Sequence, residues 1–464
     1  MNIYLSIISI SLIITFSGCS NLARSFGVDT TNNKAQDIAF AKGDYNISAI
    51  LAYQNIDQEK ELDTDNLLPA LKAGNSFLFA KEYKRSQDVL NSAEDIIKYQ
   101  HQEIKLQTSS QYLSQLMLND ASVEYKASIT DSIMLNTYKA ISYMEDGDFE
   151  ATRVEFNRAI DRQRRAKDVY AELISKQEDA IEQERRKGTK LNTSVIDSIA
   201  SSRYSNLQNF KAYPDFINPF TTYIAGLYFA LRGDYTKSID LLKEAGGMEP
   251  NNKVVAQDFE MVDDILSAKR SKPNNVWLVF ENGFAPIKQE TKLSIPVFVV
   301  SNKVSYVGIA LPVLKTRYGA YQSINLSSKD ASADTQMIAS MDRVIKTEFR
   351  YGYKYIITRA LLSATLKAVA QYQASRTSGG EYASLAVGIF SAMTTHADTR
   401  SWTTLPKDFQ ISKIDMPKDK KLSITYGLKH YNLKLDDDVQ NAIVYVRIPT
   451  STSKPSISVI NFKD

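Results

Sequence analysis

A short turn signal recurs through the first half of the chain and constrains its fold more than any other feature. The signal is Gly-Asp followed by an aromatic residue, and it stands at Gly43-Asp44-Tyr45, Gly147-Asp148-Phe149 and Gly233-Asp234-Tyr235. Each copy separates two segments whose apolar residues follow the helical period. Because glycine adopts the backbone conformations that a tight reversal needs, the pattern predicts helices packed in pairs.

The clearest copy runs from Asn218 to Pro250 and indicates how such a pair would pack. Gly226 lets the two helices touch closely, Gly233 makes the turn, and Pro250 ends the second helix. This spacing resembles the tetratricopeptide repeat, a helix–turn–helix of about 34 residues. The copies are unevenly spaced, so we expect long helical insertions between them, notably in 160–210, rather than a regular solenoid. The residues expected to pack the repeats are Gly74, Ala140, Gly147, Gly226, Gly233, Tyr235, Ala245 and Pro250.

The apolar pattern changes after the polar segment 268–275, which predicts a linker. Beyond it, β-rich runs surround a helical stretch at 334–375 and an apolar helix at 382–397. Residues 349–355 also alternate like a strand, an alternative that the flanking helical periodicity disfavours. Strands are expected at 276–280, 293–300, 304–314, 410–414, 422–426, 441–448 and 456–462.

These patterns predict an α+β multidomain protein. An all-α tetratricopeptide-like helical domain at 34–267 is followed by a mixed α+β domain at 276–464. Charged residues make up 23% of the chain and hydrophobic residues 43%, which is typical of globular domains with packed cores. The chain has one cysteine, so no internal disulfide can form and both domains must be stabilised by packing.

That single cysteine predicts where the protein resides. An apolar run from Ile3 to Phe16 leads into Ser17-Gly18-Cys19, and an apolar run that ends in small residues is typical of a secretion signal. The segment resembles the lipobox of bacterial lipoproteins, in which a lipid is added to the cysteine and the peptide before it is removed. We therefore expect a signal peptide at 1–18, lipidation at Cys19 and a tether at 19–33.

A transmembrane helix is the alternative for the apolar run. The run is interrupted by serines and is shorter than the roughly 20 residues that span a bilayer. Ser20 follows the cysteine where an Asp would indicate retention in the inner membrane. By the same resemblance, we expect a lipid anchor in the outer membrane and a chain that faces the periplasm.

Composition and motif spacing exclude several classes of function. A net charge of +3, with basic clusters that stand beside acidic residues on expected helices, argues against a nucleic-acid partner. The three histidines lack metal-ligand spacing, so neither a metal nor a cofactor is expected. Asp436-Asp437-Asp438 lacks the alternating ligands and the glycine of a calcium loop. The chain contains no phosphate loop, dinucleotide fingerprint or nucleophile elbow, so we predict that it is not an enzyme.

The best candidate site is the group Asp398, Arg400 and Trp402. The arginine can hold a carboxylate through two hydrogen bonds and the tryptophan can stack on it, which would make an anion- or glycan-binding corner. The alternative is a structural ion pair with Trp402 in the core. Lys288 could line the same domain, as could Glu281 and Glu290.

The chain as a whole resembles a widespread family of Gram-negative lipoproteins with N-terminal tetratricopeptide-like helices and a C-terminal α+β domain. Three stretches carry the resemblance: 280–288 (FENGFAPIK), 359–367 and 397–406. It implies a location and a genomic association with small lipoproteins similar to activators of penicillin-binding proteins. We therefore expect an interaction scaffold that binds a periplasmic protein or peptide on a concave helical surface, in association with cell-wall synthesis. The alternative function is a cell-wall glycan-binding protein or a carboxylate-dependent enzyme that uses the C-terminal domain.

Overall fold

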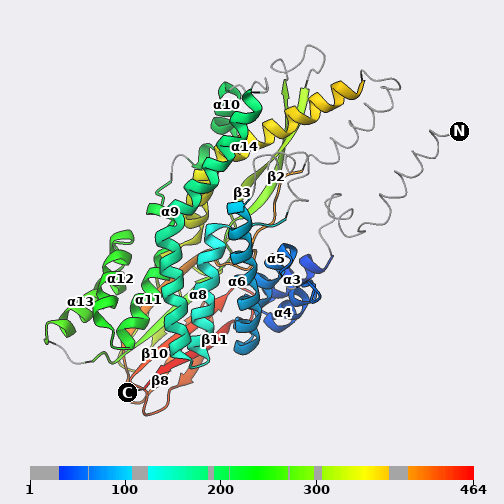
Figure 1. Ribbon diagram of the computed structural model, residues 1–464. Coiled ribbons are helices and arrows are strands. Elements are labelled where there is room, and N and C mark those ends of the chain that lie inside the picture. The colour runs from blue at the N-terminus through cyan, green and yellow to red at the C-terminus, as the bar shows by residue number, and fades with distance from the viewer. Residues whose placement is uncertain are drawn as a thin grey trace.

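The computed structural model describes residues 31–60, 62–106, 124–186, 193–207, 210–269, 272–296, 306–375 and 396–463. Helices fill the N-terminal half of this part and strands dominate the C-terminal part, which confirms the α+β prediction at the coarse level (Figure 1). Cys19, the predicted signal peptide and residues 382–395 of the last predicted helix lie outside the described residues. Within the described residues, no helix is long and apolar enough to cross a membrane.

The helices of the first half follow one another largely as adjacent pairs. They are α3 (Thr31–Lys42), α4 (Tyr45–Tyr53), α5 (Leu67–Phe79), α6 (Tyr83–Leu106), α8 (Ile129–Glu145), α9 (Phe149–Arg186), α10 (Thr193–Arg203), α11 (Pro219–Leu231), α12 (Tyr235–Met248) and α13 (Lys253–Leu266). Gly43, Gly147 and Gly233 reverse the chain between partners with φ angles of 80°, 83° and 78°. Lys81 holds the equivalent place between α5 and α6 with φ 64°. The predicted turns are therefore present, and the predicted insertion at 160–210 contains the end of α9 and all of α10.

Two of the helix pairs cross through the same set of contacts. A Cβ atom built on Gly226 would lie 3.2 Å from the side chains of Leu241 and Leu242, and the Ser238 hydroxyl donates a 2.8 Å hydrogen bond to the Gly226 carbonyl. The pair α5–α6 repeats this arrangement, with Ser86 bonded to the carbonyl of Gly74 at 2.8 Å. Small residues at these places let the helix backbones approach closely.

We expect Gly226→Leu to lower the free energy of unfolding by about 1–3 kcal/mol, because the added side chain must displace Leu242 from a packed core. Gly247, near the end of α12, is the matched control, since a Cβ atom there meets nothing within 4 Å. Chemical denaturation of both variants measures the difference. Equal stabilities for Gly226→Leu and Gly247→Leu would show that the crossing is looser than this packing implies.

The strands of the described residues form three sheets. They are β1 (Asn275–Asn282), β2 (Ile287–Pro296), β3 (Tyr306–Lys315), β4 (Asn325–Ser327), β5 (Ser332–Asp334), β6 (Gln336–Ser340), β7 (Asp408–Asp415), β8 (Lys421–Tyr426), β9 (Lys429–Lys434), β10 (Asn441–Ile448) and β11 (Ser456–Phe462). The central sheet has the order β11-β10-β1-β7-β6, with β1 parallel to β10 and antiparallel to β7. A second sheet has the order β5-β4-β8-β9, and β2 pairs with β3 alone.

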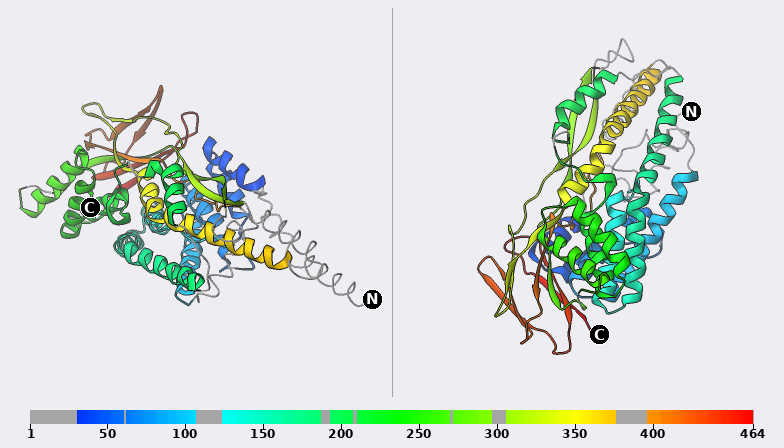
Figure 2. Two further views of the ribbon diagram at one scale, coloured as in Figure 1. Left: turned by 90° about the horizontal axis from the view of Figure 1, so that it is seen from above. Right: turned by 90° about the vertical axis from the view of Figure 1, so that its left-hand side faces the viewer.

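Strand β1 shows how the central sheet is covered on both faces. Trp277 and Val279 belong to a hydrophobic cluster with the helices. Val276 and Leu278 alternate with them and join a cluster with residues of the β4–β8 sheet. Successive side chains of a strand point to opposite faces, so the central sheet is the middle layer between the helices and the small sheet. Figure 2 shows the helical layer on one side of the strands.

The inner helices pack directly on the central sheet. Phe220 of α11 stacks on Phe409 of β7 with 3.7 Å between ring centroids. The buried Asp258 carboxylate of α13 accepts hydrogen bonds from the Trp277 indole at 3.1 Å and from Lys413 at 2.7 Å. The chain's own sheet therefore covers this face of the helices. Helices and sheet share one hydrophobic cluster across the predicted linker.

A second helical region packs against the β2–β3 hairpin. Helix α14 (Met341–Ser375) lies on β3 and α10, and Ile309, Phe349 and Ile357 share their core (Figure 1). Residues 349–355 are helical, so the strand alternative for them is wrong. The predicted start of this helix at residue 334 is also wrong, because β6 precedes it and pairs with β7.

Candidate functional site

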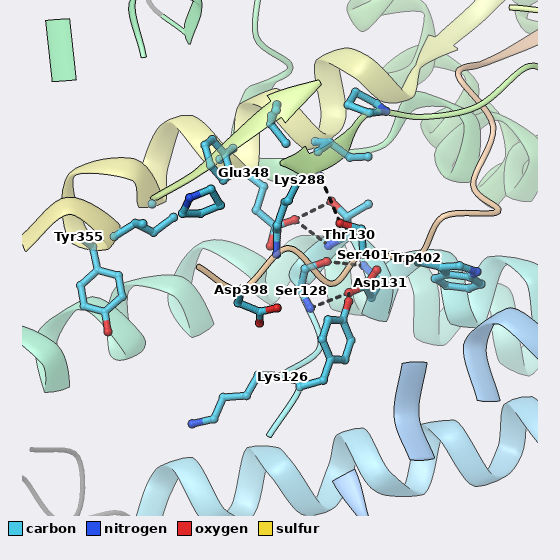
Figure 3. A pocket seen from close by; sticks show the side chains of 18 of the residues that line it. Lys126, Ser128, Thr130, Asp131, Lys288, Glu348, Tyr355, Asp398, Ser401 and Trp402 are labelled. Carbon is cyan, nitrogen blue, oxygen red and sulfur yellow. Dashed lines mark hydrogen bonds between the residues drawn. The ribbon is translucent and has the colours of Figure 1, made fainter. Parts of the chain in front are cut away.

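A cavity of about 350 Å³ lies where α8, α9 and α14 meet the β2–β3 hairpin and the segment 398–405 (Figure 3). Its described lining includes Asp398 and Trp402 of the predicted corner, together with Lys288 from β2. Arg400 is not among the described residues that line the cavity. The structure therefore brings two of the three corner residues to a common cavity with a lysine distant in sequence.

The floor of the cavity is the N-terminus of α8, and a carboxylate of the protein already occupies it. Ser128 and Asp131 form a capping box, in which Asp131 N donates to Ser128 Oγ and Ser128 N to Asp131 Oδ2, both at 2.9 Å. Glu348 of α14 accepts hydrogen bonds from Ile129 N at 2.8 Å and from the Thr130 hydroxyl at 2.6 Å (Figure 3). Burial raises the pKa of Glu348, while the bonds from Thr130 act to lower it. This contact fastens α14 to α8.

The predicted corner contains an ion pair. Arg400 Nε lies 2.9 Å from Asp398 Oδ1, and Arg400 Nη2 donates to Asp398 Oδ2 at 3.0 Å. Burial raises the pKa of Asp398, but the bond from Arg400 and the charge of Lys288 outweigh it and leave the pKa below its ordinary value. The Arg400 guanidinium stacks 5.6 Å from the centroid of the Tyr125 ring. This geometry matches the interpretation of Asp398 and Arg400 as a structural ion pair.

Trp402 is a core residue that reaches the cavity with only part of its ring. Its side chain is 3% exposed and meets Tyr138 of α8 edge-on at 5.7 Å between centroids. Its indole N–H donates to the Thr404 hydroxyl at 2.8 Å. The ring is therefore held in place by protein contacts rather than presented as an open stacking surface.

We expect Arg400→Ala to lower the free energy of unfolding by about 1.5–3 kcal/mol, the range for hydrogen bonds to charged groups. The side chains of Arg400 and Asp398 are 26% and 29% exposed, so the loss is smaller than for a fully buried ion pair. Limited proteolysis and denaturant unfolding measure it. A variant as stable as the wild type that loses function in cells would instead assign Arg400 to ligand binding.

Glu281 and Glu290 lie in separate places. Glu290 accepts a bond from Ala397 N at 2.8 Å and pairs with Lys292 at 3.4 Å. Glu281 is fully buried between the helices and the sheet, where its Oε2 lies 3.5 Å from Arg447 Nε. Glu281, Lys288 and Glu290 therefore do not form one site.

The Glu281–Arg447 pair forms a buried network that sequence reasoning missed. Tyr138 of α8 donates to Glu281 at 3.0 Å, Tyr445 of β10 donates to its other oxygen, and the Arg447 guanidinium lies 5.4 Å from the Phe40 ring centroid. Burial raises the pKa of Glu281 to about 7, although Arg447 lowers it. An arginine inside the otherwise apolar run of β10 was the available signal, since such residues are rarely buried without a partner.

Two further features of the structure concern acidic side chains. No group of three or more His, Cys, Asp or Glu side chains in the described ranges could hold a metal ion. Lys463 pairs with Asp436 and Asp438 at 3.8 Å and 2.8 Å, so this acidic run engages the lysine near the C-terminus.

No protein-family model matches the chain, and no curated protein matches its sequence.

Proposed function

We propose that the protein is an interaction scaffold, anchored in the outer membrane by a lipid on Cys19 and facing the periplasm. The carrying observation is the repeated helix crossing, in which Gly226 with Ser238 and Gly74 with Ser86 make the same contacts. Repeated helix pairs of this tetratricopeptide-like kind are typical of proteins that bind other proteins or peptides. The family resemblance supplies the partner class, which is the cell-wall synthesis machinery.

The partner would dock on the helices away from the sheet. The inner helical face is filled by β1, β7 and their neighbours. A groove of about 680 Å³ lies between α6, the start of α8 and the middle of α9. Beneath this groove, Glu94 is held by Lys139 and by Arg162 at 3.1 Å. Burial raises the pKa of Glu94, but the bond from Lys139 and the charges of Lys139 and Arg162 together lower it to about 2. A stable ionic layer of this kind would keep the groove walls in place.

The cavity beside Asp398 favours binding over catalysis. A carboxylate-dependent glycosidase needs two free carboxyl groups that face each other across the substrate. Asp131 is committed to its capping box, Glu348 to the first turn of α8 and Asp398 to Arg400. These commitments support the scaffold over the carboxylate-dependent enzyme, and the packed ring of Trp402 weighs against a glycan platform.

Replacement of the lipidated cysteine tests the anchor. We expect Cys19→Ser to shift the protein from the outer-membrane fraction to the soluble periplasm and to abolish acyl labelling. Ser20→Ala, which leaves the cysteine in place, is the control. Recovery of Cys19→Ser in the outer membrane at the level of the control would refute a lipid anchor on this residue.

Site-specific photocrosslinking in cells tests the groove. A photoreactive residue at Arg165, which lines the groove on α9, should capture a component of the cell-wall synthesis machinery. The same probe at Leu428, which is 98% exposed in the β8–β9 turn, is the control. Equal capture of the same protein from both positions, or capture from Leu428 alone, would place the docking surface elsewhere.

A further inference from the structure

The cavity beside Lys288 has the properties of a small-molecule site. We propose that it binds a long-chain carboxylate, with the carboxylate on the Lys288 ammonium and the apolar chain against α14 and β3. This inference is independent of the scaffold proposal and of the lipid anchor, because it rests on this cavity alone. At about 350 Å³ it reaches the lower end of the sizes typical of ligand pockets.

One wall of the cavity is apolar. Phe349 and Ile356 of α14 belong to this wall, together with Pro312 and Leu314 of β3. These side chains come from a helix and a hairpin that pack on each other through a core of their own. An apolar chain bound here would displace water from this wall. Burial of its apolar surface would contribute about 25 cal/mol per Å² to the free energy of binding.

The described lining of the cavity contains the acidic residues Glu124, Asp131, Glu348 and Asp398, and the last three are engaged by hydrogen bonds within the protein. Glu348 accepts hydrogen bonds from Ile129 N and Thr130, Asp131 caps α8, and Asp398 is held by Arg400 through two bonds. A cationic ligand would have to compete with these internal donors. The internal pairing of these three carboxylates therefore disfavours a cationic ligand.

Lys288 is the cation that the internal pairing leaves for a ligand. Among the described residues no carboxylate lies within ion-pair distance of its ammonium, whereas Lys292 on the same strand pairs with Glu290 at 3.4 Å. Lys288 lies close enough to Asp398 to lower its pKa, yet the Asp398 oxygens are bonded to Arg400. Figure 3 shows Lys288 and Asp398 among the side chains around the same space. The Lys288 ammonium beside an apolar wall matches an amphipathic molecule with one negative head group.

Two probes with the same chain and opposite head groups test the proposal. Dodecanoate and dodecyltrimethylammonium are titrated by calorimetry, below their micellar concentrations, into the full chain carrying Cys19→Ser. We expect one dodecanoate to bind, with a preference over the ammonium of about tenfold or more, the effect of one charge-assisted hydrogen bond. Lys288→Met should remove this preference, and Lys288→Arg should retain it. Lys292→Met, four residues along β2, should behave as the wild type.

Filling the apolar wall gives an independent readout. Ile356→Trp should weaken binding of dodecanoate by about tenfold or more, because the larger side chain occupies the space of the chain. Circular dichroism and thermal unfolding check that each variant is folded. Absence of saturable dodecanoate binding by the wild type, equal affinity for both probes, or a preference that survives Lys288→Met would each overturn the proposal.

Discussion

Arg447→Met is expected to lower the free energy of unfolding by about 3–5 kcal/mol, the usual cost of removing one partner of a buried ion pair. The Glu281 carboxylate would remain between the helices and the sheet with Tyr138 and Tyr445 as its hydrogen-bond donors but without its cation. Methionine fills a similar volume, so the loss reports on charge more than on packing. Denaturant unfolding of the Cys19→Ser chain measures the effect.

Two further variants isolate the cause. The double variant Glu281→Gln with Arg447→Met removes both charges and should recover most of the loss, because a neutral pair costs less to bury. Arg153→Met removes a surface partner of Asp234, where the arginine is 44% exposed, and should change stability by less than about 1 kcal/mol. An Arg447→Met protein as stable as Arg153→Met would mean that Glu281 is accommodated as a neutral acid at no cost.

The pH dependence gives the sign of the Glu281 contribution. Burial raises its pKa in the native state from 4.5 to about 7, so the native state holds a proton that the unfolded state releases. Stability from this group is therefore present below about pH 4.5 and is lost as the pH rises to about 7. The loss caused by Arg447→Met should accordingly be larger at pH 8 than at pH 5.

Gly43→Ala is expected to destabilise the protein more than the same change at Gly147 or Gly233. The three glycines share φ near 80°, which costs an L-residue about 1–2 kcal/mol. At Gly43 the added methyl would also overlap the Lys454 carbonyl and lie 2.8 Å from Lys454 N. Nothing lies within 4 Å of a Cβ atom at the other two positions. We therefore expect a further loss of about 1–3 kcal/mol for Gly43→Ala.

The additional loss would come from separation of the first helix pair from the end of the sheet. The turn at Gly43 is tied to the loop after β10, since Lys454 N donates to the Lys42 carbonyl at 3.0 Å and the Lys454 ammonium lies 2.8 Å from Asp44. Limited proteolysis should release α3 and α4 earlier in Gly43→Ala than in Gly147→Ala. Equal stabilities of the three alanine variants would show that the loop moves aside freely.

The local features of the chain could be predicted from its sequence. The helix pairs, their glycine turns and the close crossing at Gly226 follow from short-range periodicity and from residues with special backbone preferences. The ion pair of Asp398 and Arg400 has the same character, because the two residues are only two positions apart. Such interactions form between neighbours along the chain, so the sequence contains the information directly.

The arrangement of these elements was decided by long-range packing. β6 is a strand because β7 pairs with it. The parallel pairing of β1 with β10 joins two segments that lie far apart in the sequence. The central sheet covers one face of the helices, since the apolar side chains of α5, α8 and α11 need a partner and the sheet supplies one.

The candidate sites likewise combine features that are local in the sequence with features that depend on long-range packing. Sequence alone predicted the pairing of Asp398 with Arg400 and a lipid anchor on Cys19. Only the tertiary structure placed Lys288 opposite Asp398 in a shared cavity and joined Glu281 to Arg447. The two residues of each pair lie far apart in the sequence, so no local pattern predicts that they meet. Their charges come together only because the packing of separate elements places them side by side.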